Sequence, residues 1–491
     1  MFRTRWMIAA AATAVLIGTA LLWSATAGTI DVKNVVNNSL KAMGADNLKT
    51  IEYSGTGADF SVGQAMNPRS GWPRFTYKTY TRQIDFNAPA SRMQRVRVQG
   101  ENPPRGGGGQ PLVGEQNQNQ VVTDPTQLNN ELTTMLPYSF LRSAANATDA
   151  TVKETKMNNK PYTEVSFAGP NKAMINGYVN AQGLVEKIET TIDNNVLGDT
   201  PFVTTFTDYK NFNGLRFPTH IVQKTGDWPS FELMITGVKN NPSITIENPQ
   251  AKGKGKGGPG GPGPGGASAE SPTEDLGGGC FLILGGYASV ACDFKDGIYV
   301  VEGPQNDQRA EAIIAASKKL IPNKPIKYVI NTHDHFDHNG GLRRFIAEGA
   351  IIVTDEINKP YYEKIFKNPH TLNPDYLSKN PKKAAFLTVR EERKMTDGEH
   401  SLEIYHVQDS MHNDGMLMVY LPAQKTIIEA DEFNPPPPNQ PVANPSPYWE
   451  ILNHNLERLK LDYDRIIPIH YPNDNRKVMK AELLRAVGKE N

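Results

Sequence analysis

Residues 331–341 read NTHDHFDHNGG, so three histidines and two aspartates fall within six positions. The apolar residues 326–330 before this stretch predict a short buried strand. Gly340 and Gly341 after it free the backbone before a new helix. Neutral imidazole and carboxylate are nitrogen and oxygen ligands that zinc prefers. The stretch therefore predicts a metal-binding loop at the end of a strand, and a solvated polar loop is the alternative.

The spacing within this stretch allows two ions. His333 and His335 are two positions apart, and side chains alternate along an extended segment, so both imidazoles face the same side. Asp337 and His338 follow at once, and on a turning loop they can face a second ion.

Three later residues complete the set of candidate ligands. His412 lies between the predicted strands 400–407 and 415–421, Asp431 follows the predicted strand 425–430, and His470 ends the segment IIPIH. Each lies just beyond the carboxyl end of a strand, where open α/β sheets place their chemistry. The other five histidines are interpreted as structural or surface residues: His220, His370, His400, His406 and His454.

Because these candidate ligands follow one another in this order along the chain, residues 277–491 resemble the metallo-β-lactamase fold superfamily. The resemblance implies an α/β fold, an αββα sandwich with a metal centre at one edge. It implies two Zn²⁺ per chain, with iron or manganese as the alternatives. It also implies a first ion held by His333, His335 and His412, a second held by Asp337, His338 and His470, and Asp431 bridging the two with a water or hydroxide.

The same resemblance narrows the reaction. True β-lactamases typically carry cysteine or serine near position 431, whereas a bridging aspartate is typical of glyoxalase-II-like thioesterases, lactonases and phosphodiesterases. Flavo-diiron relatives usually carry glutamate at position 335, so an oxygen-reducing site is disfavoured. Apart from Arg343 and Arg344, no cationic cluster accompanies the ligand loops. We therefore expect a small-molecule substrate with an uncharged ester, thioester, lactone or amide-like bond, and Asp337 and His335 as the candidate catalytic residues.

Three alternatives remain open at this point. They are a β-lactamase-type hydrolase, a mononuclear iron enzyme acting on sulfur compounds, and a periplasmic protein that binds an apolar ligand and has a slow metal domain. The substrate pocket is expected between residues 434–440, which include four consecutive prolines, and the excursion at 367–385. Asp334 and Asp355 are candidates to hold the ring N–H groups of ligand histidines.

The N-terminus predicts export. Arg3 and Arg5 precede an apolar run at 7–23 and small residues at 25–27, which is typical of a signal peptide over residues 1–27. An uncleaved membrane anchor is the alternative, and a bacterial periplasm is the expected location. The formal net charge of the 491 residues is zero, so nothing indicates a nucleic-acid partner.

Residues 28–248 predict a β-rich, mostly antiparallel accessory domain with helices near 28–48 and 126–135 and a long mobile loop at 100–120. Residues 207–218 resemble a hairpin of periplasmic lipoprotein-carrier and outer-membrane-sorting domains, which implies a curved sheet around an apolar groove. A plain accessory domain is the alternative. Residues 249–276 are rich in Gly and Pro and predict a flexible linker to the catalytic domain at 277–491.

Cys280 and Cys292 are the only two cysteines and lie on neighbouring predicted strands. They could pair in an oxidising compartment. A two-residue turn at Gly285-Gly286 would instead place Cys280 opposite Ala291, so the pattern favours two buried free thiols.

Overall fold

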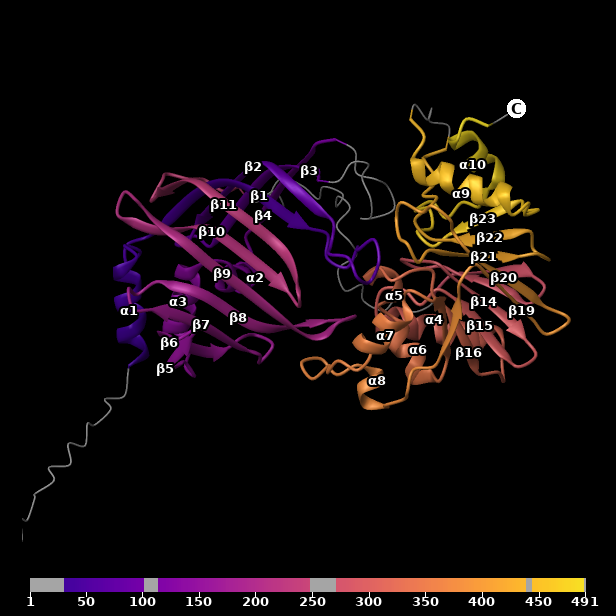
Figure 1. The fold of residues 1–491 in the computed structure, drawn as a ribbon, viewed down its shortest axis with the longest axis horizontal. Coiled ribbons are helices and arrows are strands. Elements are labelled where there is room, and N and C mark those ends of the chain that lie inside the picture. The colour runs from indigo at the N-terminus through magenta and orange to yellow at the C-terminus, as the bar shows by residue number, and fades with distance from the viewer. Residues whose placement is uncertain (1–30, 101–113, 248–270, 439–443, 490–491) are drawn as a thin grey trace, which may run out of the picture.

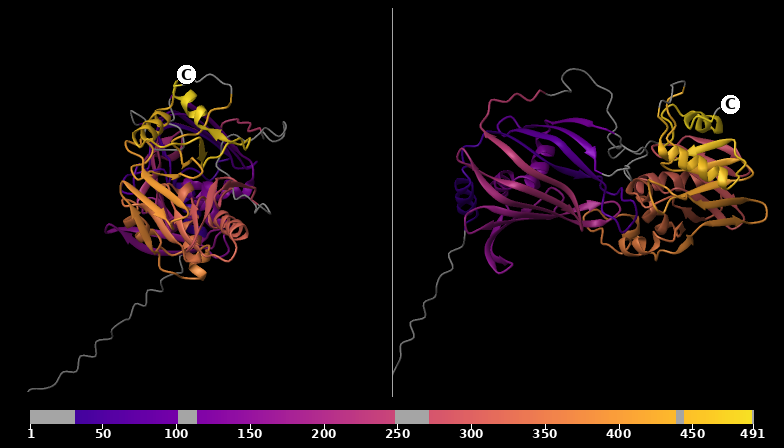
Figure 2. Two further views of the ribbon diagram at one scale, coloured as in Figure 1. Left: turned by 90° about the vertical axis from the view of Figure 1, so that its right-hand side faces the viewer. Right: turned by 45° about the horizontal axis from the view of Figure 1, so that its top comes forward.

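The structure, a computed structural model, describes residues 31–100, 114–247, 271–438 and 444–489. The predicted signal peptide and residues 249–270 of the predicted linker lie outside these ranges. Figure 1 shows two lobes side by side, and the second view of Figure 2 separates them in the same way. Within the described ranges, no helix is both long enough and apolar enough to span a bilayer.

The first lobe is built on one eleven-stranded sheet in the order β4-β3-β2-β1-β11-β10-β9-β8-β7-β6-β5. Every neighbouring pair is antiparallel, which confirms the predicted strand arrangement. The strands are β1 (Thr50–Phe60), β2 (Arg74–Asp85), β3 (Ala90–Gln99), β4 (Gln116–Val122), β5 (Thr151–Met157), β6 (Lys160–Ala168), β7 (Met174–Asn180), β8 (Val185–Asn194), β9 (Gly198–Phe212), β10 (Leu215–Thr225) and β11 (Trp228–Asn240).

Three helices share the apolar core of this sheet: α1 (Val32–Ala42), α2 (Pro125–Met135) and α3 (Pro137–Asn146). Apolar residues alternate along the strands, so the second half of β2 turns Tyr80 and Ile84 into the core. Each such side chain contributes roughly 1.5–3 kcal/mol through burial. Asp124 caps α2 by accepting a hydrogen bond from the Gln127 N–H, which explains where this helix begins.

Several elements of the first lobe differ from the predictions. Residues 116–120, predicted as part of a loop, belong to the edge strand β4, and β5, β11 and α3 were not predicted. The side chains of β4 are polar, but its backbone pairs with β3 along seven residues, from Gln116 to Val122. Backbone pairing at a sheet edge needs no apolar pattern, so the residue types of β4 did not reveal the strand.

The second lobe contains two sheets. One has the order β12-β13-β14-β15-β16-β17-β18 and the other β19-β20-β21-β22-β23-β24. Their strands are β12 (Thr273–Gly277), β13 (Cys280–Ile283), β14 (Ser289–Phe294), β15 (Gly297–Val301), β16 (Ile326–Ile330), β17 (Ile351–Asp355), β18 (Phe386–Val389), β19 (Glu392–Thr396), β20 (Ser401–His406), β21 (Leu417–Leu421), β22 (Thr426–Glu429), β23 (Arg465–Pro468) and β24 (Val478–Met479).

Helices cover the outer face of each sheet. One apolar cluster joins Val290 and Ile330 of the first sheet to Val419 and Ile467 of the second, so the sheets pack face to face. A second cluster packs α4, α6 and α7 on the seven-stranded sheet, and a third packs α9 and α10 on the other. This confirms the predicted αββα sandwich. The helices are α4 (Asp307–Leu320), α5 (Phe336–Asn339), α6 (Leu342–Glu348), α7 (Lys359–Ile365), α8 (Tyr376–Lys379), α9 (Pro447–Arg458) and α10 (Lys480–Ala486).

Smaller features of the second lobe also depart from the predictions. Thr273 to Leu276, assigned to the linker, begin β12, and the short elements β19, β24, α5 and α8 were not predicted. Cys280 and Cys292 form a disulfide, so the expectation of free thiols was wrong. The turn between β13 and β14 spans residues 284–288 rather than two residues, which places Cys280 directly opposite Cys292 with 4.1 Å between the Cα atoms.

Candidate metal centre

The candidate ligands meet at one edge of the sandwich, where strands from both sheets end. β16 runs into the histidine stretch, whose last part forms the single turn α5. His412 lies in the loop before β21, Asp431 follows β22, and His470 follows β23. Because β22 and β23 are parallel neighbours, their carboxyl ends bring Asp431 and His470 together.

The structure gathers all seven candidate ligands into three overlapping groups. Within each group the donor atoms lie within 4.8 Å of one another. Two groups coincide with the predicted ligand sets of the two ions. The groups are His333, His335 and His412; His333, His338 and Asp431; and Asp337, His338 and His470.

Asp431 lies between the two predicted sets, as a bridging ligand would. Its Oδ2 atom is 3.5 Å from Nε2 of both His333 and His412 and 2.7 Å from Nε2 of His338. Its Oδ1 atom is 2.9 Å from Nε2 of His470. One carboxylate thus faces donors of both sets.

The first set has the features of a cation site. His333 Nε2, His335 Nδ1 and His412 Nε2 are buried and lack a hydrogen-bond partner among the described residues. An unsatisfied buried polar atom costs about 1–3 kcal/mol, and coordination to a metal would remove that cost. Burial lowers the pKa of His333 and His335, and lowers that of His412 to about 3. These imidazoles are therefore neutral at pH 7, which is the form that binds metal.

The second set attracts positive charge. Burial opposes protonation of His338, but the carboxylates of Asp431 and Asp337 raise its pKa well above the usual value. Burial likewise opposes ionisation of Asp431, yet His470 and His338 lower its pKa well below the usual value. Carboxylates that stay ionised in a buried site stabilise a cation. The chemistry of both sets therefore fits a metal.

A chain of hydrogen bonds fixes the orientation of His333. The Thr332 hydroxyl donates to the Glu302 carboxylate at 2.5 Å, so its oxygen accepts from His333 Nδ1 at 3.1 Å. This leaves His333 Nε2 without a proton on the side of the centre. Glu302 and Asp431 both have positive φ angles, +75° and +63°. Such backbone strain is concentrated at functional sites.

Three further residues hold candidate ligands, and the sequence did not reveal them. The Tyr287 hydroxyl donates to Asp337 Oδ2 at 2.8 Å, and the Gln64 amide donates to Asp337 Oδ1 at 2.8 Å. The Ala65 carbonyl accepts from His335 Nε2 at 2.8 Å. Gln64 and Ala65 belong to the first lobe, and no motif in their neighbourhood marked them.

The two predicted supporting carboxylates lie elsewhere. Asp334 accepts a hydrogen bond from Asn413 at 2.6 Å, and burial raises its pKa to about 7. Asp355 contacts the ring of His406 at 3.0 Å, which is not a candidate ligand. The prediction that these two residues hold ligand histidines was therefore wrong.

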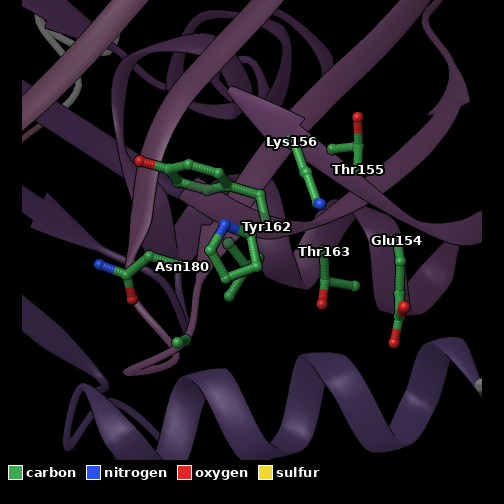
Figure 3. Close-up of a pocket in the computed structure, with 9 residues that line it drawn as sticks. Glu154, Thr155, Lys156, Tyr162, Thr163 and Asn180 are labelled. Atoms are coloured by element: carbon green, nitrogen blue, oxygen red, sulfur yellow. The ribbon is translucent and has the colours of Figure 1, made fainter. Parts of the chain in front are cut away.

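A hollow of 440 Å³ on the first lobe is separate from this centre. It is lined by β5, β6 and β7, at the sheet edge opposite β4, and Figure 3 shows its side chains. Its lining includes Glu154, Lys156, Tyr162 and Asn180 but no histidine or cysteine. It offers no comparable set of metal ligands.

Comparison with known proteins agrees with this geometry. The sequence model of the metallo-β-lactamase superfamily matches residues 303–470. This segment is a metallo-β-lactamase superfamily domain. The matched segment carries the histidine and aspartate groups that can hold metal, so the metallo-β-lactamase likeness belongs to the second lobe.

Solved structures similar to the chain include two metallo-β-lactamases. The protein from Pontibacter korlensis is 15% identical, with 45% of this chain and 98% of the other covered and a TM-score of 0.34. The protein from Hirschia baltica is 18% identical, with 45% and 97% covered and a TM-score of 0.33. No curated protein matches the chain.

Proposed function

We propose that the protein is an exported hydrolase that uses two zinc ions to cleave an ester, thioester, lactone or amide-like bond in a small molecule. The observation that carries this proposal is the pair of complete donor sets that share Asp431. Two zinc ions held there would acidify a shared water and polarise the bond to be cleaved. A set that had lost its function would be expected to lack a donor, whereas all seven candidate side chains belong to the donor groups, which supports the proposal.

The chain's own residues prepare the centre for this chemistry. The neutral rings of His333, His335 and His412 present free nitrogen lone pairs to the first ion. Asp337 is held by donors on both carboxylate oxygens, so it keeps one orientation toward the second. His470 and Asp337 are 28% and 29% exposed, whereas the other candidate ligands are buried. This half of the centre therefore faces the side from which a substrate can enter.

The ion pairs of the two arginines near the histidine stretch support an uncharged substrate. Arg343, which is 4% exposed, pairs with Asp375, and Arg344 pairs with Glu311 and Glu348. Both guanidinium groups are therefore engaged with carboxylates and are not available to a phosphate. The disulfide Cys280–Cys292 is typical of an oxidising compartment and supports export.

Metal analysis with a substrate panel tests the proposal. Purified protein should contain two zinc ions per chain and hydrolyse a lactone, ester or thioester in preference to a phosphodiester or a chromogenic lactam. One iron per chain without zinc would overturn the dinuclear zinc proposal, and preference for the lactam would restore the β-lactamase alternative.

Substitution of one ligand from each set tests the two-ion mechanism. Asp337→Ala and His335→Ala should each lower kcat/KM at least 100-fold, because each removes a ligand while leaving both sheets intact. The control is His454→Ala, an exposed histidine on α9 outside all donor groups, which should keep wild-type turnover. Normal hydrolysis by Asp337→Ala would refute the mechanism.

A further inference from the structure

The loop between β1 and β2, residues 61–73, reaches from the first lobe onto the histidine stretch (Figure 1). The Gly63 carbonyl accepts from the Phe336 N–H at 3.1 Å, and the Met66 carbonyl accepts from the Asp414 N–H at 2.7 Å. The Trp72 ring meets the Phe336 ring edge-on with 6.4 Å between centroids. The β1–β2 loop is thus docked beside the candidate ligands by both backbone and ring contacts.

Gly63 is what permits this close approach. Its φ is +79°, and a Cβ atom there would lie 2.3 Å from Cγ of Phe336. Any larger residue would have to strain the backbone and displace either the loop or the Phe336 ring.

One contact of the loop sets the chemistry of His335. A carbonyl oxygen only accepts hydrogen bonds, so the 2.8 Å contact with Ala65 requires the proton of His335 to be on Nε2. Nδ1 is then unprotonated, buried and without a hydrogen-bond partner among the described residues, on the side of the first donor set. Asn413 donates to the same carbonyl at 3.2 Å and fixes its direction.

A second contact sets the orientation of Asp337. The Gln64 amide donates to Oδ1, opposite the Tyr287 hydroxyl on Oδ2. Oδ2 is the oxygen that approaches the second set, at 3.6 Å from His338 Nε2 and 3.9 Å from His470 Nε2. Gln64 therefore prevents the carboxylate from rotating away from these histidines.

We propose that the β1–β2 loop is a structural part of the metal centre, with Ala65 and Gln64 as positioning residues for one ligand of each ion. This inference rests on the proposed two-ion centre. It gives the first lobe a direct role: without its loop, His335 loses the partner that selects its tautomer and Asp337 loses one of its two donors. Removing such a partner of a ligand typically weakens metal binding 10–100-fold.

Zinc titration of the full-length chain against a chromophoric chelator at pH 7 tests Gln64. Gln64→Met keeps the length of the side chain and removes the donor. It should lower the affinity for the ion at Asp337, His338 and His470 by 10–100-fold and leave the affinity for the other ion unchanged. Two zinc affinities equal to those of the wild type would overturn the role of Gln64, as would a wild type that binds a single zinc.

Asn67→Leu is the matched control. Asn67 donates an amide hydrogen bond of the same 2.8 Å length from the same loop to Asp414, which is not a candidate ligand. Its loss removes one exposed contact while the backbone contacts of Gly63 and Met66 keep the loop docked, so both zinc affinities should stay at wild-type values. Equal effects of the two variants on zinc would mean that Gln64 acts only through docking, and would overturn the proposal for Gln64.

Gly63→Ala tests the whole loop. It should weaken both ions, while Gly214→Ala, with φ of +93° and no atom within 4 Å of an added Cβ, serves as the control for backbone strain. Circular dichroism and the thermal midpoint confirm that each variant is folded. Wild-type affinity for both ions in Gly63→Ala would overturn the proposal. Zinc binding that follows these expectations without hydrolysis of any substrate would sink the proposed function alone.

Discussion

Asp337 shows how one ligand depends on several neighbours. Tyr287 donates a hydrogen bond to its Oδ2 atom. The centroid of the Tyr287 ring lies 4.4 Å from the ring centroid of His470 and 5.3 Å from that of His338. Burial raises the pKa of Tyr287, and the negative charge of Asp337 raises it further. The phenol therefore remains a proton donor at every physiological pH, and one side chain supports three ligands of the second set.

Tyr287→Phe separates the hydroxyl from the ring. The ring contacts with both histidines should persist, while Asp337 loses a hydrogen bond to a charged group, worth about 1.5–3 kcal/mol. We expect kcat/KM and the affinity for the second zinc to fall about 10–100-fold. Tyr299→Phe removes a similar tyrosine–aspartate bond, to Asp296 at 3.1 Å, and should change neither. Unchanged zinc affinity in Tyr287→Phe would show that the hydroxyl does not hold the ligand.

The sequence identified the candidate ligands that the structure brings together, but not the residues that hold them in place. His412, Asp431 and His470 each follow an apolar run that is visible as a strand, so their places at strand ends could be inferred. Gln64 lies 273 positions from Asp337, and Ala65 acts through its backbone carbonyl, which leaves no trace in residue type. Contacts of this kind are established only when the two lobes pack.

At the scale of the elements, β12 links the two sheets of the second lobe. It pairs with β13 in the seven-stranded sheet, while Glu274 on β12 accepts two hydrogen bonds of 2.9 Å from Arg465 on β23 of the other sheet. Residues 273–276 of β12, TEDL, are too polar to predict as a strand and were assigned to the linker. Like β4, it is defined by its partners rather than by its own pattern.

Glu274→Gln should lower the stability of the second lobe by an amount that depends on pH. Hydrogen bonds from Arg465 and Lys477 lower the pKa of Glu274 from 4.5 to about 2. As the pH falls, Glu274 is therefore protonated at a higher pH in the unfolded chain than in the folded chain. The stabilisation is present above about pH 4.5 and is lost as the pH falls towards 2. Because solvent screens this partly exposed ion pair, we expect it to contribute about 1 kcal/mol to the free energy of unfolding at pH 7.

The measurement is the thermal midpoint of the wild type and the variant between pH 7 and pH 3. The variant should melt lower at pH 7, and the difference should shrink as the pH falls. Glu457→Gln, which removes an exposed pair with Lys489, is the control and should give a smaller difference. A gap that stays constant with pH would mean that the ion pair does not contribute.

At the scale of the molecule, the lobes meet in a second place besides the β1–β2 loop. The hairpin between β8 and β9 contacts the excursion at 367–385, which was expected to frame a pocket. The Asp199 carboxylate accepts from the Thr371 hydroxyl and N–H at 2.5 and 2.8 Å and from the Leu372 N–H at 3.1 Å. Val196 joins the apolar cluster of the second lobe. Two separate contacts restrict rotation of one lobe about the other, which keeps the β1–β2 loop on the candidate metal centre.

These contacts predict that the lobes unfold together. Each hydrogen bond to the partly exposed Asp199 carboxylate contributes about 0.5–1.5 kcal/mol, and Gly63→Ala displaces the other contact. Wild-type protein should give one calorimetric transition, and the double variant Gly63→Ala, Asp199→Ala should give two, because each lobe has a core of its own.

Asp85→Ala provides the comparison for Asp199, since Asp85 accepts two backbone hydrogen bonds, from Asn87 and Ala88, within the first lobe alone. Combined with Gly63→Ala it should lower the midpoint but preserve a single transition. If the Asp199 double variant also unfolds in one step, the two contacts do not couple the lobes. The β1–β2 loop would then be the contact that holds the first lobe on the candidate metal centre. In that case Gly63→Ala should change the zinc affinity by the same factor whether or not Asp199 is present.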